Sequence, residues 1–235
     1  MSLLRFSSPL VLLCSALVLQ GCAQWLPYQT QFYQLEQGEP KLPKSDKGPA
    51  VLLGPLTLAD YLQRENLIQR EPDDSLTVSQ RERWAGSLED DVGQLLLRQL
   101  AGQLNTSRIV LYPDRVGFDG EVQVLVHISR LDSGAKRPAV LEAQWRLLDG
   151  AGTLRSSRLV RLQEAHLGTP VAQVHAQSLL LQRLAEQLTD AINNMPQAEP
   201  VALPKAKPPV TEKRLDNAPQ MPVIEPAKQM DVFRF

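Results

Sequence analysis

The chain has 235 residues, of which 43% are hydrophobic and 22% are charged. Its 25 basic and 26 acidic side chains leave a net charge of -1, so the charge balance does not support nucleic-acid binding, which needs a clustered basic face. The length is that of one folded domain with additional tails.

The N-terminal segment has the features of a bacterial lipoprotein signal. Arg5 precedes an apolar stretch over residues 9–19, which is shorter than the roughly 20 residues that a membrane-spanning helix needs. Gly21 and Cys22 then resemble a lipobox, the site at which the thiol is lipidated and the chain is cut. We therefore predict removal of residues 1–21 and acylation of Cys22. The alternative is an ordinary secretory signal with an incidental cysteine.

Acylation at Cys22 predicts a stable membrane anchor. Maturation adds three acyl chains, and each buried CH₂ contributes about 0.8 kcal/mol. Ala23 follows the cysteine, where an Asp would resemble the inner-membrane retention signal, so the predicted location is the inner leaflet of the outer membrane, facing the periplasm. The second cysteine, Cys14, lies in the predicted signal, and the mature chain is left without a thiol or a disulfide.

A short tether over residues 22–30 is followed by elements that predict a folded domain. A first strand is expected over residues 31–35, and a second over residues 50–53, ending in a turn at Gly54-Pro55. Residues 75–79 alternate between apolar and polar side chains, as a half-buried strand does.

Two helices have clear start signals. The first begins after Trp84, where Ser87 and Asp90 form a variant of a capping box. In the second, Thr169 is suited to cap the helix and Pro170 to its first position. Apolar residues recur along this second helix with alternating spacings of three and four. That seam predicts a helix lying on its own sheet, with a coiled-coil contact as the alternative.

Three strands lie between the helices. They are expected over residues 120–130, 141–147 and 153–163, with a loop beginning at residues 132–134. Short connections between successive strands predict an antiparallel meander with one face toward a core. The predicted fold class is therefore α+β, with an antiparallel sheet meander and two principal helices packed on one face, and the predicted domain covers residues 31–195.

The composition changes at residue 196. Eight prolines alternate with charges of both signs over residues 196–235, which predicts a disordered or polyproline-like tail. The tail ends in an apolar cluster, Val232-Phe233-Arg234-Phe235. Two interpretations are open, a featureless end and a short peptide that docks on a partner.

The sequence offers no motif for catalysis, a metal or a cofactor. His127, His166 and His175 lack the spacing of metal ligands, and the acidic run Glu89-Asp90-Asp91 suits the positive end of a helix dipole. A periplasmic hydrolase would need a nucleophile beside a base, but Ser156-Ser157 lies on a predicted strand with no obvious base nearby. We therefore expect a protein that is not an enzyme.

An ordered series of motifs resembles a known family. Behind the lipobox, the series is similar to the PqiC/YmbA-type auxiliary lipoproteins of ABC transport systems, over about residues 31–194. It consists of Gly54-Pro55-Leu56-Thr57-Leu58-Ala59-Asp60-Tyr61-Leu62-Gln63-Arg64, Arg83-Trp84-Ala85, Leu111-Tyr112-Pro113, Val122 to Asp132, and Glu142-Ala143-Gln144-Trp145-Arg146-Leu147.

The resemblance implies a function in lipid transport. That family is associated with MCE-domain proteins, which build hydrophobic tunnels for lipids across the periplasm. The chain would then be a non-enzymatic accessory subunit at the outer membrane, receiving the end of a PqiB-like tunnel and supporting envelope integrity. The alternative is an independent outer-membrane assembly or structural lipoprotein that binds other envelope proteins.

The resemblance also implies which residues and which assembly to consider. A homo-oligomeric ring around the tunnel mouth would be natural, because identical head-to-tail interfaces can close into rings. The matching positions are candidates for partner contact, with structural roles as the alternative, since large aromatics dominate small cores. They are Gly54, Pro55, Tyr61, Arg64, Arg83 and Trp84.

Overall fold

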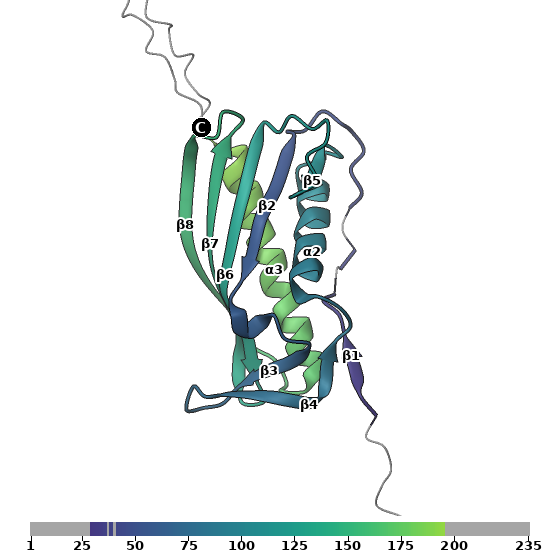
Figure 1. Ribbon diagram of the computed structural model, residues 1–235, viewed down its shortest axis with the longest axis vertical. Helices are drawn as coiled ribbons and strands as arrows, with labels where there is room; N and C mark the ends of the chain where they lie inside the picture. Colours follow the sequence, from purple (N-terminus) through teal and green to yellow (C-terminus); the bar gives the residue numbers. More distant parts are fainter. Residues whose placement is uncertain (1–28, 37, 40, 196–235) are drawn as a thin grey trace, which may run out of the picture. The chain divides into compact units, whose positions relative to one another are not determined.

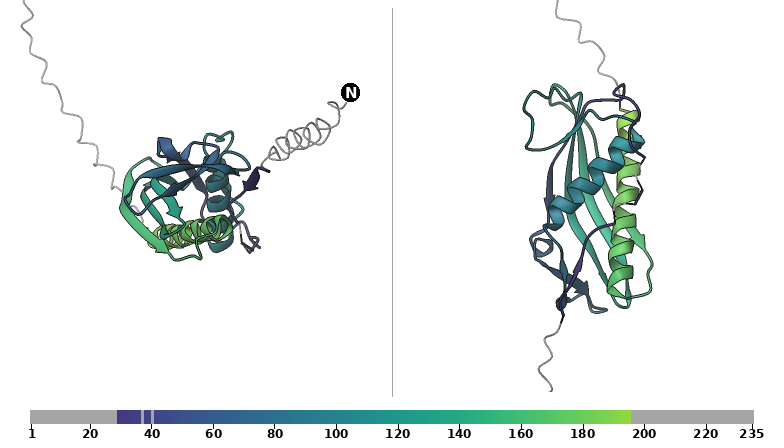
Figure 2. Two further views of the ribbon diagram at one scale, coloured as in Figure 1. Left: turned by 90° about the horizontal axis from the view of Figure 1, so that it is seen from below. Right: turned by 90° about the vertical axis from the view of Figure 1, so that its right-hand side faces the viewer.

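Two long helices cover one face of a curved sheet. The computed structural model describes residues 29–36, 38–39 and 41–195. The helices are α2 (Leu88–Gln103) and α3 (Pro170–Asn193), and Figure 2 shows both on the same side of the strands. The predicted signal, the acylation site Cys22 and the proline-rich tail lie outside the described residues.

The main sheet contains the predicted meander and two further strands. β6, β7 and β8 pair antiparallel in sequence order, whereas β2 pairs parallel with both β5 and β6 (Figure 1). The predicted α+β class, the meander and the two helices on one face are confirmed, and the parallel pairs make the sheet mixed. In spatial order the strands are β5 (Ile109–Leu111), β2 (Val51–Leu58), β6 (Val122–Gly134), β7 (Arg137–Asp149) and β8 (Leu154–Glu164).

Three further strands continue the sheet from the C-terminal end of β6. They are β3 (Asn66–Arg70), β4 (Leu76–Trp84) and β1 (Gln31–Tyr33), and the single-turn helix η2 (Asp60–Leu62) connects β2 to β3. β3 meets β6 in parallel at the pair Gln69 and Ser133, β4 is antiparallel to β3, and β1 pairs parallel with β4. This small sheet forms the lower end of the domain in Figure 1.

The core lies between the main sheet and the helices. Alternate residues of β6, from Val122 to Ile128, are buried together with Leu141 and Leu147 of β7. The apolar seam of α3 packs on the sheet and on α2, with Leu181 and Leu188 fully buried, which confirms the prediction of a helix lying on its own sheet.

Both predicted helix starts are confirmed. The Ser87 hydroxyl accepts a hydrogen bond from the Asp90 N–H at 3.2 Å, and the Thr169 hydroxyl accepts one from the Ala172 N–H at 3.3 Å. Each cap satisfies one of the N–H groups that a first helical turn leaves without a partner.

Several predicted strand ends were wrong. The strand predicted over residues 75–79 extends as β4 to Trp84. β2 does not end at Gly54-Pro55 but continues to Leu58, with a shift of register against β6 between Leu53 and Leu56. This bulge admits Pro55, which has no N–H to donate to a ladder. β6 likewise continues through residues 132–134, predicted as a loop, because β3 pairs with that end of the strand and Asp132 and Ser133 are buried there.

Candidate functional site

Gly54 and Pro55 form part of the sheet framework. Gly54 has a φ of +118°, and a Cβ at this position would lie 2.7 Å from the Cβ of Tyr112. The Tyr112 N–H donates to the carbonyl of Leu53 at 2.8 Å, and the Gln123 side-chain amide donates to the carbonyl of Gly54 at 2.8 Å. The glycine therefore allows β5 and the segment after it to approach β2 closely.

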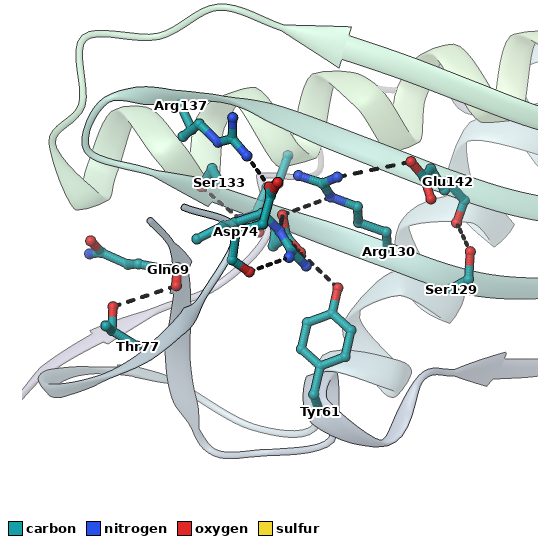
Figure 3. Close-up of polar contacts among 12 residues, drawn as sticks. Tyr61, Gln69, Asp74, Thr77, Ser129, Arg130, Ser133, Arg137 and Glu142 are labelled. Atoms are coloured by element: carbon teal, nitrogen blue, oxygen red, sulfur yellow. Dashed lines mark hydrogen bonds and ion pairs between the residues drawn. The ribbon is translucent and has the colours of Figure 1, made fainter. Parts of the chain in front are cut away.

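Tyr61 belongs to a buried polar network that joins the small sheet to the main sheet. Its hydroxyl, on η2, donates to Asp132 Oδ2 at 2.8 Å (Figure 3). The same carboxylate on β6 accepts from Arg70 Nη2 at 2.7 Å, and from Arg130 Nε at 2.9 Å. One carboxylate on β6 thus binds η2 and β3, which lie more than 60 residues earlier in the sequence.

The electrostatics of this network keep Asp132 ionised. Burial raises the pKa of Asp132, but hydrogen bonds from Arg70 and Tyr61 and the charge of Arg130 outweigh this effect, and the pKa is lowered below its ordinary value of 3.8. Burial, and then the neighbouring Asp132 charge, raise the pKa of Tyr61 well above its ordinary value of 10.0. Tyr61 is therefore a neutral hydrogen-bond donor at physiological pH, and the groups of this network keep the same ionisation states throughout the physiological pH range.

Arg64, Arg83 and Trp84 line one groove, with a volume of about 710 Å³. We call it the β1–α2 groove, because it lies between β1, the turn after η2, the end of β4 and the start of α2. Its complete lining is Phe32, Gln63, Arg64, Glu65, Arg83, Trp84, Ala85, Gly86, Ser87, Leu88 and Glu89.

The β1–α2 groove combines aromatic and charged side chains. Phe32 is 66% exposed beside it, whereas Trp84 is buried and packs with the core. Arg83 pairs with Glu65 at 3.5 Å, and both side chains are open to solvent. Exposed aromatic side chains and arginines are enriched where proteins bind one another.

The structure separates the six sequence-predicted positions into three places. Arg64, Arg83 and Trp84 meet in the β1–α2 groove, Tyr61 lies in the Asp132 network, and Gly54-Pro55 lies in the β2 bulge. Sequence reasoning missed the Asp132 network, because Asp132 was placed at the start of a loop. The available signal was a charged residue, Asp132, two positions after the end of the predicted alternating strand.

The histidines are apart from one another, and their contacts are structural. His127 is exposed on β6, with Nδ1 2.8 Å from the Thr57 hydroxyl oxygen. His175 Nδ1 lies 2.7 Å from Glu36 Oε2 at the start of α3. Within residues 29–195, apart from the two positions omitted, no group of three or more His, Cys, Asp or Glu side chains is arranged to hold a metal ion.

The chain belongs to the family of ABC-type transport auxiliary lipoprotein components, whose sequence pattern matches residues 33–189. The family comprises envelope lipoproteins that serve ABC-type transport as auxiliary components. The PqiC/YmbA-type resemblance is thereby confirmed. No curated protein sequence matches the chain significantly.

Solved structures show the same fold. The crystal structure of an uncharacterised protein is similar with a TM-score of 0.57 at 17% identity, covering 70% of this chain and 99% of the other. A crystal structure from Xanthomonas campestris is similar with a TM-score of 0.56 at 15% identity, covering 68% and 93%. At these identities the likeness concerns the fold alone. Of the helices that the structure describes, none is long and apolar enough to span a membrane.

Proposed function

We propose that the protein is a non-enzymatic accessory subunit of an MCE-type intermembrane lipid transport system that supports envelope integrity. Acylated Cys22 anchors it in the inner leaflet of the outer membrane, and the domain faces the periplasm and binds a PqiB-like tunnel protein. The observation that carries this proposal is an auxiliary-lipoprotein domain, over residues 33–189, directly behind a lipobox cysteine.

The β1–α2 groove is the surface we assign to the tunnel protein. It combines an exposed aromatic ring, Phe32, with the partly exposed side chain of Arg83, and the buried Trp84 also contributes to its lining. Eight residues separate Cys22 from β1, so a fully extended tether reaches about 30 Å at most. A partner in this groove is therefore held close to the acceptor membrane.

Site-specific photo-crosslinking in intact envelopes tests this assignment. A photoreactive residue replaces Phe32 or Arg64 in the full-length acylated protein, and Ser157, exposed on β8 away from the groove, is the control position. We expect an MCE-domain protein to be captured from the two groove positions and not from Ser157.

Two results would contradict the proposal. Capture of outer-membrane assembly factors alone, with crosslinking shown to work, would favour the alternative of an independent assembly or structural lipoprotein. Equal capture of the MCE-domain protein from Ser157 would remove the groove as the contact surface while leaving the partner in place.

A ring of identical subunits is the assembly that fits this function. A tunnel mouth is surrounded most simply by copies that contact one another head to tail, since such interfaces close when the rotation between subunits permits. Each subunit would contribute one lipid anchor and one groove.

A further inference from the structure

A second cleft, rich in arginine, lies on the face of the main sheet opposite the helices. Its volume is about 450 Å³, and it is found where the β3–β4 hairpin meets β6, β7 and β8. We call it the arginine cleft. Its charged and polar lining consists of Arg70, Asp74, Arg130, Arg137, Arg161 and Gln163.

Two of the four guanidinium groups are fixed in place from behind. Asp132, whose side chain is fully buried, holds Arg70 at 2.7 Å and Arg130 at 2.9 Å. The two arginine side chains are themselves only 15% and 17% exposed. Donor groups that are already fixed before a ligand binds lose less conformational freedom on binding, which lowers the entropic cost of binding.

The other two guanidinium groups form weak surface pairs. Arg137 pairs with Asp74, and Arg161 pairs with Glu142, in contacts that are open to solvent (Figure 3 shows the first). Exposed ion pairs of this kind contribute about 0 to 1 kcal/mol, so an incoming anion displaces them at small cost.

The cleft retains unused donors and excess positive charge. Each guanidinium has five N–H groups, and among the described residues Arg130, Arg137 and Arg161 each donate one hydrogen bond to a carboxylate. Arg130 Nη1 also lies 4.0 Å from Glu142 Oε1, an ion pair that uses no further N–H at hydrogen-bond distance. Four cationic side chains face three carboxylates, those of Asp74, Asp132 and Glu142, of which Asp132 is inaccessible.

We propose that the arginine cleft binds a phosphate group. Arginine recognises phosphate through paired N–H···O bonds, and the tetrahedral oxygens can accept from several guanidinium planes at once. The apolar lining is limited to Pro138 and the nearly buried Val140, so the cleft suits a headgroup and not an acyl chain. The phosphate can belong to a phospholipid headgroup or to a free phosphate, and the experiment separates these sources.

Calorimetric titration of the full-length acylated protein in an uncharged detergent tests the site. The probes are inorganic phosphate and dihexanoyl phosphatidylglycerol. The test variant is Arg137→Gln/Arg161→Gln, and Arg146→Gln/Arg158→Gln is the matched control, because it removes two exposed arginines of β7 and β8 outside the cleft. Single Arg161→Gln repeats the comparison if the double variant is unstable, since this side chain is 57% exposed.

We expect saturable binding that weakens at least about tenfold in the test variant and less than twofold in the control. Binding of inorganic phosphate identifies the free anion as sufficient, whereas binding of the lipid alone identifies the headgroup. Absence of saturable binding of either probe, or equal loss in both double variants, would overturn the proposal. The assay contains no MCE-domain protein, so its result is separate from that of the crosslinking experiment.

Discussion

Asp132 determines how the small sheet is attached to the main sheet. Its carboxylate accepts hydrogen bonds from Tyr61 on η2 and from Arg70 at the end of β3. It also accepts one from Arg130, two residues earlier on β6. Because the carboxylate is buried, its removal leaves two cationic groups near the interior without their counter-ion. The negative charge of Asp132 therefore adds to the backbone pairing of β3 with β6 in attaching the small sheet.

Asp132→Asn should lower the free energy of unfolding by about 3 to 5 kcal/mol, because breaking one partner of a buried ion pair leaves uncompensated charge. Urea denaturation of the full chain measures the change. Asp74→Asn is the control, since Asp74 pairs with Arg137 through a side chain that is 68% exposed, and should cost at most about 1 kcal/mol. Equal losses in the two variants would show that the Asp132 network does not stabilise the fold.

The Asp132 network also predicts a dependence of stability on pH. The pKa of Asp132 is lower in the folded chain than its ordinary value of 3.8, so its stabilisation is complete above that value. As the pH falls below 3.8, the unfolded state binds the proton first and the stabilisation is lost progressively. Denaturation midpoints measured between pH 7 and pH 2 should show this decline. The decline should be smaller in Asp132→Asn, and an unchanged profile would contradict the assignment.

At the scale of elements, local sequence patterns predicted those features of the fold that depend on residues close together in the chain. The β6–β8 meander follows from alternation of apolar residues and short turns, and the starts of α2 and α3 follow from Ser87 and Thr169. Parallel pairing of β2 with β5 and β6 was not predictable in this way, because it joins segments more than 50 residues apart.

The candidate site shows the same division. The family motifs selected Arg64, Arg83 and Trp84, which do share a groove, but gave no indication that Phe32 completes it. Arg70 and Asp132 are 62 positions apart, and their pairing depends on β3 meeting the end of β6. A polar residue after an alternating run indicates a loop unless a strand distant in the sequence covers it. Local sequence patterns do not predict pairing with such a strand.

The β2 bulge gives a test at this scale. The control variant is Gly152→Ala. Gly152 has a φ of +79°, and no atom lies near the methyl group that the substitution would add, so the backbone conformation alone should lower the free energy of unfolding by about 1 kcal/mol. Gly54→Ala should cost about 1 to 3 kcal/mol more, because its methyl group would overlap Tyr112. Thermal or urea unfolding of the two variants measures the difference. Equal losses of stability in the two variants would mean that the segment containing Tyr112 can move away from β2 at no cost in free energy.

For the whole molecule, the lipid anchor makes a direct prediction. Cys22→Ala should abolish incorporation of labelled palmitate and release the protein from the outer-membrane fraction, because three acyl chains provide the membrane affinity. Fractionation of cells that express the wild-type and variant chains gives the measurement. A wild-type protein that carries no label would favour the ordinary secretory signal.

The proposed ring predicts a closed oligomer. Sedimentation of the full-length acylated protein in detergent should give one species larger than the monomer, with the same stoichiometry over a range of protein concentrations, because a closed ring has no free interfaces. A strictly monomeric protein at concentrations comparable to those in the envelope would contradict the ring.

β1 and the C-terminal end of α3 lie toward opposite ends of the domain's long axis (Figure 1). α3 has 24 residues and is about 36 Å long. The start of β1, which follows the proposed anchor, and the C-terminal end of α3 are therefore separated by a distance on the order of one helix length, so in the proposed arrangement the domain acts as a spacer between these two points.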